Sequence, residues 1–302
     1  VIAAVLWLYT QKRLAQNTAI ILVGILMIFD LFFVDKKYVS GKDFMNGREV
    51  AAPFQETPAD IQILRDPSNY RVFEVSGNLS SARASYFHKS LGGYHAAKPR
   101  RIQQLFDYQI AKNNIEVLDF LNVKYIIQTD KEGKEFPTVN PNANGNAWFV
   151  SQIKTVSSAD EEMKALDKFD SKNVAIVNTK EFTIQNKNFV KDASAVITLD
   201  AYKPNHLTYT STNTNAGLAV FSEMYYAKGW KAYVDGKETP IYRADYVLRA
   251  IEIPAGKHQL EFKFEPQVVQ TGSLIALVSS IGMLLLLVGG IYIERKKIKK
   301  IE

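Results

Sequence analysis

One uncharged apolar run constrains this chain more than any other feature of its sequence. Residues 272–293 read GSLIALVSSIGMLLLLVGGIYI and contain no charged side chain. A helix of this length extends about 33 Å, which is enough to cross the hydrocarbon core of a bilayer. The residues that follow, 294–302, carry five basic and two acidic side chains. Because basic flanks mark the cytoplasmic end of a span, the sequence predicts a transmembrane helix with a basic cytoplasmic tail.

A second apolar stretch lies near the start of the chain. Residues 19–34 read AIILVGILMIFDLFFV, with Asp30 as the one charge, and residues 1–10 are apolar as well. Because the chain opens inside an apolar run, it is expected to be a fragment of a longer protein. Two basic residues in the connecting loop favour a cytoplasmic position for that loop. Residues 35–271 are therefore expected outside the cytoplasm.

The positive charge of the chain is concentrated beside these apolar runs. Lys and Arg total 37 against 31 Asp and Glu, a net charge of +6, of which residues 35–271 carry only +2. This distribution reflects membrane topology rather than a nucleic-acid surface, so no nucleic-acid partner is predicted. The chain contains no cysteine, which excludes a thiolate zinc site and a cysteine nucleophile.

The first half of the polar middle mixes helix and strand patterns. Apolar residues recur with helical spacing over 101–122, and residues 123–129 form the pattern of a buried strand. Residues 158–169 begin with a helix-capping serine and carry apolar residues at helical spacing. These patterns favour an extracytoplasmic α/β domain over residues 35–170.

Strand patterns alone fill the second half. Alternating segments follow one another from residue 174, and turn residues separate them. Asp235-Gly236 and the segment 254–257 are both interpreted as hairpin turns. About seven such strands predict a β-sandwich over residues 171–271. The expected fold class is thus a membrane protein fragment in which transmembrane α-helices flank an α/β domain and a β-sandwich domain.

The densest group of polar and aromatic residues lies at 84–101. Basic side chains there are suited to phosphate or sugar-phosphate groups, and Gly92 and Gly93 allow close approach of the backbone. An ordered loop with its basic residues near lipid head groups is the alternative interpretation. The candidate substrate-binding residues are His88, Lys89, Tyr94, His95, Lys98, Arg100 and Arg101.

Two further residues complete the set of candidates. Asp30 is a carboxylate within an apolar segment, where ionisable residues are costly and often functional. An interfacial aspartate paired with a lysine or a neighbouring helix is the alternative. Trp230 lies beside the Asp235-Gly236 turn, where an aromatic ring either stacks on a sugar or fills the core. No residue pattern predicts a catalytic group or a metal site within this chain.

Six segments carry a resemblance to a known family. They are DLFFVDKKYV at 30–39, RVFEV at 71–75, ARASYFHKSLGGYHAAKPRRIQQL at 82–105, LNVKYII at 121–127, GNAWFV at 145–150 and GWKAYVDGKETPIYRADYVLRAIEIPAGKH at 229–258. In this order, and followed by the last apolar run, they resemble the YfhO-like family of bacterial membrane proteins, in particular its Bacteroidetes-type members. The resemblance covers essentially the whole chain.

The resemblance implies a class of activity. The family is similar to polytopic GT-C glycosyltransferases, which transfer sugars from lipid-linked donors to acceptors on the outer face of the membrane. The chain is then the C-terminal part of such an enzyme in the bacterial inner (cytoplasmic) membrane, with its catalytic residues upstream. The implied partners are membrane lipid, a polyprenyl-phosphate-linked sugar and a cell-envelope polysaccharide. The cofactor stays open, with a divalent metal ion in the full-length protein as a candidate.

Two other classes of function stay open. The chain is alternatively a non-catalytic, membrane-anchored module whose β-sandwich binds an envelope polysaccharide or a partner protein. Many membrane spans upstream, with an acidic external loop, would favour the enzyme, and one or two spans would favour the binding module. A transporter ranks last, because Asp30 is the one charged residue within the apolar segments.

Overall fold

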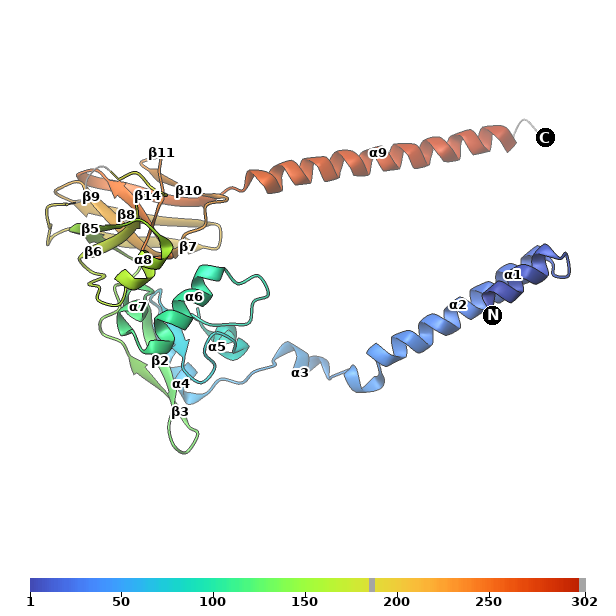
Figure 1. Cartoon of the computed structure of the whole chain (residues 1–302), viewed down its shortest axis with the longest axis horizontal. Coiled ribbons are helices and arrows are strands. Elements are labelled where there is room, and N and C mark those ends of the chain that lie inside the picture. Colours follow the sequence, from blue (N-terminus) through green and yellow to red (C-terminus); the bar gives the residue numbers. More distant parts are fainter. Residues whose placement is uncertain (185–187, 299–302) are drawn as a thin grey trace. The chain divides into compact units, whose positions relative to one another are not determined.

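The computed structural model describes residues 1–184 and 188–298. The chain divides into two compact units, Val1–Gln55 and Glu56–Glu302, which are described separately (Figure 1). The first unit is helical. It consists of α1 (Ile2–Thr10), α2 (Gln16–Tyr38), the 3-10 turn η1 (Gly41–Asp43) and α3 (Gly47–Ala51).

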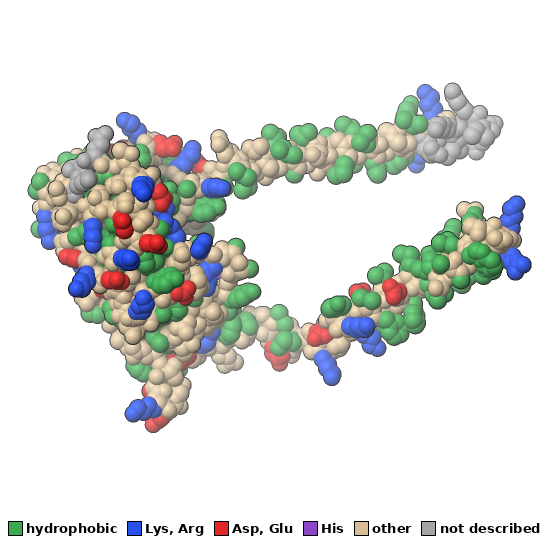
Figure 2. Space-filling model, in the orientation of Figure 1, with side chains coloured by type: hydrophobic (Ala, Val, Ile, Leu, Met, Phe, Trp, Pro, Cys, Tyr) green, Lys and Arg blue, Asp and Glu red, His purple; other side chains and the backbone are tan. Residues whose placement is uncertain are grey.

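Two helices in the described part of the chain are long and apolar enough to cross a bilayer. They are α2 and the segment Gln267–Ile293 of α9 (Gln267–Ile298). Both extend beyond the predicted apolar cores at 19–34 and 272–293. Hydrophobic side chains cover both helices (Figure 2), and those of Ile28 and Leu286 are 70% and 78% exposed. Apolar surface of this extent needs lipid or protein to cover it.

A small three-stranded sheet and several short helices begin the second unit. β1 (Arg71–Glu74) pairs in parallel with β2 (Val123–Thr129), which pairs with β3 (Glu135–Val139) in antiparallel fashion. The associated helices are α4 (Pro58–Ile63), α5 (Ala82–Phe87), α6 (Arg100–Tyr108), η2 (Ile110–Lys112) and α7 (Ile115–Phe120). The helical spacing over 101–122 therefore belongs to separate helices: α6 ends at Tyr108, and Asn113, with a φ of 61°, ends η2 before α7 begins.

Two larger sheets form the rest of the second unit. The six-stranded sheet has the order β4 (Ala147–Val150), β9 (Gly217–Met224), β13 (Leu248–Ile253), β12 (Tyr242–Ala244), β6 (Val174–Asn178) and β5 (Gln152–Val156). The five-stranded sheet has the order β11 (Lys237–Thr239), β10 (Trp230–Val234), β14 (Gly256–Phe264), β8 (His206–Asn213) and β7 (Val196–Lys203). Helix α8 (Ala159–Ala165) lies between β5 and β6 in the sequence.

The six-stranded sheet joins the two predicted domains. Its strands β4 and β5 precede residue 170, whereas its other strands follow that residue. The predicted boundary at 170–171 therefore runs through one sheet, and residues from Glu56 onward form a single compact unit. The two predicted domains share this sheet because β4 pairs with β9, a strand far from it in sequence: Ala147–Val150 lies against Leu218–Phe221.

One of the two predicted hairpins is confirmed and the other is wrong. Asp235 and Gly236 both have positive φ, 51° and 78°, and they join β10 to the paired strand β11. Segment 254–257 instead connects β13 to β14, and these strands belong to different sheets. This turn therefore carries the chain from one sheet to the other.

Side chains of both large sheets form one hydrophobic cluster. The rings of Tyr209, Phe221 and Phe262 meet edge to face, with the Phe221 and Phe262 centroids 4.8 Å apart. The opposite face of the six-stranded sheet is covered too, because Leu218 and Leu248 join the cluster that includes residues of α7 and α8. A strand buried on both faces shows a continuous apolar run, which explains the sequence GLAVF at the start of β9.

Candidate functional site

A polar cavity of about 210 Å³ lies between the three-stranded part of the second unit and its larger sheets. We call it the basic cavity. Its wall combines cationic, aromatic and amide side chains with one carboxylate. The lining residues are Asn69, Tyr70, Arg71, Lys89, Ser90, Asn122, Tyr202 and Glu223.

Arg71 holds the elements around the basic cavity together. Its Nη1 donates to the carbonyl oxygens of Leu121, at 2.8 Å, and Ser222, at 2.5 Å. Its Nη2 lies 3.5 Å from Oε1 of Glu223, whose side chain is only 13% exposed. The guanidinium therefore joins the start of β1, the end of α7 and the end of β9.

Lys89 reaches the cavity from the segment that follows α5. This segment is extended, because Val72 N donates to the Lys89 carbonyl and Leu91 N donates to the Val72 carbonyl. The ammonium nitrogen donates to Oδ1 of Asn69 and lies 3.4 Å from the centre of the Tyr202 ring. Burial lowers the pKa of Lys89, and the nearby carboxylate of Glu223 opposes this shift.

Arg249 adds a third cation behind the Glu223 carboxylate. It is 3% exposed, its guanidinium lies 3.9 Å from the Trp230 ring centre, and its Nε donates to the carbonyl of Met224 at 2.8 Å. Burial lowers its pKa to about 10, while the charge of Glu223 acts in the opposite direction. Its Nη1 is buried and has no hydrogen-bond partner among the described residues.

The charges around the basic cavity do not balance. Arg71, Lys89 and Arg249 surround the single carboxylate of Glu223, and each of them interacts electrostatically with it. An unpaired buried guanidinium N–H is costly, and the positive charge of Arg249 adds to that of Arg71 and Lys89, the two cations that line the cavity. Tyr70 and Tyr202 add aromatic surface of the kind that packs on sugar rings. The arrangement is therefore suited to an anionic sugar derivative.

His88 belongs to a different network from its neighbour Lys89. Adjacent side chains of an extended segment point to opposite sides. The His88 ring is 2% exposed, and its Nε2 lies 2.9 Å from Oδ1 of the fully buried Asp60. Arg83 also contacts Asp60, and it lies 3.4 Å from Glu74. The imidazole of His88 thus holds the end of α5 to the start of α4.

Arg101 enters a third network, which involves α8 and the β12–β13 turn. Its Nη1 lies 3.0 Å from Oε2 of Glu162 and donates to the carbonyl oxygen of Tyr246 at 3.1 Å. Arg243 lies 3.7 Å from the same Glu162 oxygen. Burial raises the pKa of Glu162, although both guanidinium groups lower it. Lys89 and Arg101 therefore do not form one site.

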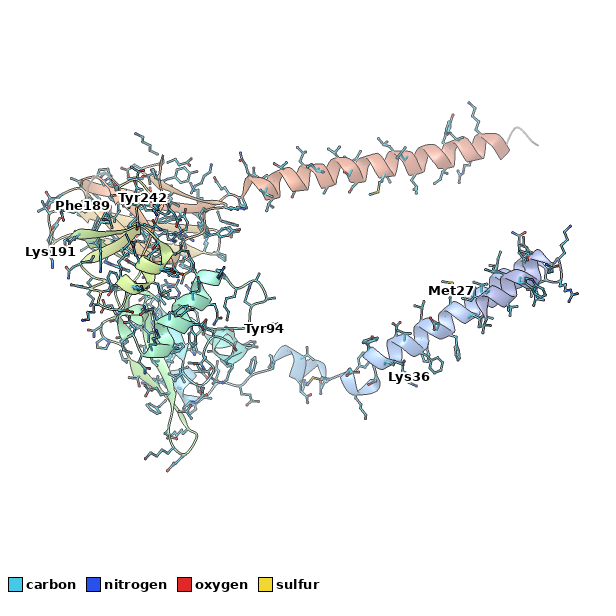
Figure 3. The ribbon with its side chains drawn as sticks, viewed as in Figure 1. Met27, Lys36, Tyr94, Phe189, Lys191 and Tyr242 are labelled. Atoms are coloured by element: carbon cyan, nitrogen blue, oxygen red, sulfur yellow. The ribbon has the colours of Figure 1, made fainter. Side chains whose placement is uncertain are left out.

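The other candidates of segment 84–101 lie on a loop and at the start of α6. Tyr94 is 80% exposed and projects from the loop between α5 and α6 (Figure 3). His95 accepts from Ala97 N through its Nδ1 at 3.1 Å, and Lys98 donates to the Leu79 carbonyl at 3.2 Å. Arg100 is exposed at the first turn of α6.

The two remaining candidates lie in different units. Asp30 is exposed on α2, in the first unit. Trp230 begins β10 and stacks against Arg249, so it supports the third cation of the basic cavity.

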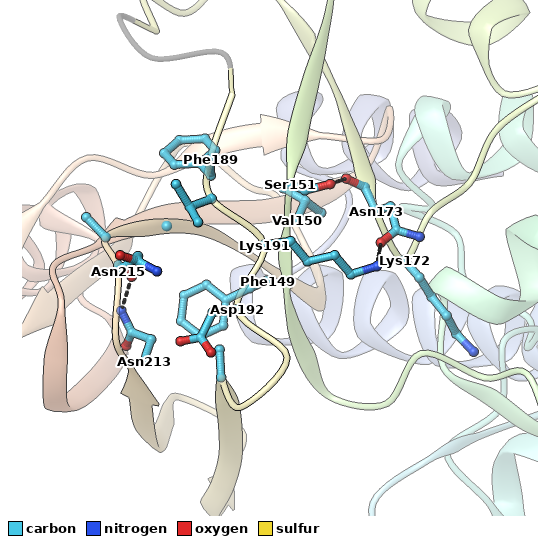
Figure 4. A pocket seen from close by; sticks show the side chains of 14 residues that line it. Phe149, Val150, Ser151, Lys172, Asn173, Phe189, Lys191, Asp192, Asn213 and Asn215 are labelled. Carbon is cyan, nitrogen blue, oxygen red and sulfur yellow. Dashed lines mark hydrogen bonds between the residues drawn. The ribbon is translucent and has the colours of Figure 1, made fainter.

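A smaller cavity of about 100 Å³ lies near the start of β9 (Figure 4). Its polar groups are largely paired with one another. Lys191 donates to Oδ1 of Asn173 at 2.8 Å, and Asp192 accepts from both the N–H and the hydroxyl of Thr214 at 2.7 Å. Because these groups satisfy each other, the basic cavity is the stronger candidate for a ligand site.

Three lining residues of the basic cavity, and the cation beside it, were not among the sequence candidates. They are Arg71, Tyr202 and Glu223 in the lining, and Arg249 beside it. The sequence carries a signal for Arg249. This residue interrupts the apolar strand pattern YVLRAI, and a charged side chain that is buried in such a strand needs a partner. The other three residues lie in unremarkable strand positions, and tertiary pairing alone brings them together.

Metal ligands do not cluster in the described residues. Residues 1–184 and 188–298 contain no group of three or more His, Cys, Asp or Glu side chains that could hold a metal ion. The candidate divalent metal was assigned to the full-length protein, so it is not tested by this chain.

Comparison with known proteins places part of this chain in context. Residues 162–276 match the family described as bacterial membrane protein YfhO. The "Uncharacterized protein YfhO" of Bacillus subtilis (strain 168) is 26% identical over 129 residues, which cover 43% of this chain and only 14% of that relative. No solved structure matches the chain. The matched segment includes Tyr202, Glu223 and Arg249 of the basic cavity.

Proposed function

We propose that this chain, a YfhO-like membrane protein, binds an anionic sugar derivative in its basic cavity as part of a larger sugar-transferring machine. The proposed machine is a GT-C-type glycosyltransferase of the bacterial cell envelope. It takes a sugar from a polyprenyl-phosphate-linked donor and passes it to an envelope polysaccharide, and its catalytic residues lie outside this chain. The second unit would hold the phosphate-bearing donor or an acidic acceptor.

One observation carries this proposal. Three cations surround one carboxylate, and a buried N–H of Arg249 has no partner among the described residues. Phosphate or carboxylate oxygens would accept hydrogen bonds from Lys89 and Arg71, which line the cavity, and the charge of Arg249 beside it would add to the attraction; such charge-assisted bonds are stronger than neutral ones. The Tyr202 ring beside Lys89 would contact the sugar.

The proposed orientation follows from the basic flanks of the two apolar helices. The second unit would face the outside of the cytoplasmic membrane, where lipid-linked sugars are used by GT-C-type enzymes. Residues beyond 293 would lie in the cytoplasm. The chain covers a small part of the relative, so the activity of the whole machine stays a proposal.

Substitution of Lys89 tests the binding step. Lys89→Met keeps the length of the side chain and removes its charge, so it should weaken binding of glucose 1-phosphate about tenfold. The measurement is isothermal titration of glucose 1-phosphate into the purified chain in detergent. Lys154→Met, at an exposed position of β5, is the matched control and should bind as the unmodified chain does.

The same titration separates the alternatives. Equal affinity of the Lys89→Met variant and the unmodified chain would refute the basic cavity as an anion site. Binding that depends on Lys89, together with normal envelope glycosylation in cells carrying the full-length Lys89→Met protein, would favour the non-catalytic binding module over the transferase.

A further inference from the structure

A short loop between β9 and β10 exposes aromatic side chains beside the entrance to α9. We call residues 225–230 the aromatic loop. Tyr226 is 54% exposed, and Ala227 and Lys228 are exposed as well. Trp230 and Tyr226 line a cavity of about 210 Å³ that is distinct from the basic cavity. The function proposed above uses none of this exposed surface.

The aromatic loop is tied to the residues that lead into α9. Glu265 N donates to the Gly229 carbonyl at 2.6 Å. The Phe264 ring centre lies 5.3 Å from that of Trp230 and 6.4 Å from that of Tyr226. Gly229 permits this approach, because a Cβ at this position would lie 2.6 Å from the Phe264 ring.

The length of α9 determines how far this loop is from a bilayer. Gln267 follows Phe264 by three residues, which span at most about 11 Å. The apolar segment Gln267–Ile293 has 27 residues, which as a helix extend about 40 Å, whereas the hydrocarbon core is about 30 Å thick. The uncharged run at 272–293 alone extends about 33 Å and fills this core, so the preceding residues 267–271 are expected in the head-group layer.

The charges near the aromatic loop favour contact between its aromatic rings and the lipid over electrostatic attraction of the loop to anionic lipid. Lys231 lies 3.8 Å from Glu238 and 4.0 Å from Glu265. Together with Lys228 these groups carry no net charge. Tyrosine and tryptophan favour the membrane–water interface, because a ring can be buried while its polar end stays hydrated.

We propose that the aromatic loop lies in the lipid head-group layer and fixes the second unit against the membrane surface, with Tyr226 as its main lipid contact. The contact depends on the aromatic ring, so it is independent of anionic lipid and of salt. It holds whether or not the basic cavity binds a sugar.

Fluorescence quenching by brominated lipids tests this placement. Tyr226→Trp is made in the full chain together with Trp7→Phe, Trp148→Phe and Trp230→Phe, so that position 226 holds the single tryptophan, and the protein is placed in nanodiscs of brominated or ordinary phosphatidylcholine. We expect brominated lipid to reduce the fluorescence, most strongly when bromine lies near the head group. The loss should be the same with phosphatidylglycerol added and at high salt.

Phe136→Trp in the same background is the matched control, because Phe136 is an exposed aromatic residue of another sheet. We expect no quenching there. Absent quenching at position 226, or equal quenching at both positions, would overturn the proposal. Native Trp230 in a chain carrying Trp7→Phe and Trp148→Phe gives a second readout with the loop unaltered, and its quenching should follow that of position 226.

Discussion

Two buried carboxylates of the second unit, Asp60 and Asp245, have pKa values that are shifted in opposite directions. Burial raises the pKa of Asp60, but hydrogen bonds from Thr57 and His88 and the charge of Arg83 lower it further, so the net shift is downward. Burial and the charge of Glu162 raise the pKa of Asp245 well above the ordinary value, although a hydrogen bond from Ile176 N acts in the opposite direction. The contributions of the two residues to the free energy of unfolding therefore change with pH in opposite directions.

Asp60→Asn should destabilise the second unit by about 3–5 kcal/mol, because it removes one partner of a buried ion pair. The lowered pKa of Asp60 means that its contribution is present above pH 3.8 and is lost as the pH falls below that value. Urea unfolding at pH 7 and at pH 3 measures both effects. The difference between variant and unmodified chain should shrink at pH 3, whereas Asp107→Asn, at an exposed site, should change little.

Asp245→Asn should have the opposite effect. Oδ1 of Asp245 accepts from Ile176 N at 2.8 Å, and an asparagine oxygen can accept the same bond. Because the folded chain raises the pKa of Asp245, its ionisation costs stability as the pH rises above 3.8. The variant should be more stable at pH 7, by roughly 1 kcal/mol for each unit of raised pKa.

The advantage of Asp245→Asn should vanish near pH 3, where the acid is neutral in both folded and unfolded chains. Urea unfolding across this range checks the trend. A variant that is less stable than the unmodified chain at both pH 3 and pH 7 would mean that the asparagine amide, placed where Oδ2 of Asp245 has no partner among the described residues, costs more than the neutralised charge gains. A loss of stability at pH 7 alone would contradict the raised pKa.

At the scale of elements, the β9–β10 connection depends on one glycine. Gly229→Ala should lower the free energy of unfolding by about 1–3 kcal/mol, because φ is +121° and the new Cβ would meet the Phe264 ring. Gly236→Ala is the control, since its φ is also positive but no atom lies within 4 Å of the added Cβ. The strain of its positive φ alone should cost about 1 kcal/mol, which is less than the loss expected for Gly229→Ala. Equal losses in thermal melts would contradict the role of the Phe264 contact.

Strands and long apolar helices could be predicted from the sequence because their signals are local. Alternation of apolar and polar residues identified the strands from 174 onward, and apolar runs identified the cores of α2 and α9. Sheet membership could not be predicted. Segment 254–257 has turn residues like those of a hairpin, and only the packing of two sheets shows that it joins different sheets.

The residues that form the basic cavity could not be predicted as a group either. Lys89 was a sequence candidate, yet Arg71, Glu223 and Arg249 join it through three separate elements. Spacing within one segment predicted that Lys89 and Arg101 would act together. In the structure, Arg101 instead pairs with Glu162 of α8, a long-range contact that no local pattern contains.

At the scale of the whole molecule, the proposed topology is testable because the chain has no cysteine. Lys172→Cys, at an exposed position of the second unit, should react with a membrane-impermeant maleimide in spheroplasts. Lys296→Cys, near the end of α9, should react only after the membrane is permeabilised. Labelling of both sites in intact spheroplasts, or of the second alone, would contradict the proposed orientation.

The order of strands in the six-stranded sheet also has a consequence for synthesis. Strand β5 can pair with β6 as soon as Asn178 is made, but β4 has no partner in this sheet until β9 is complete at Met224. At roughly 5–20 residues per second, the ribosome needs about 4–15 s for the residues between Val150 and Met224. Strand β4 therefore waits with unpaired edges, and non-local pairing of this kind folds slowly. A chaperone that shields β4 during this interval should raise the yield of folded protein.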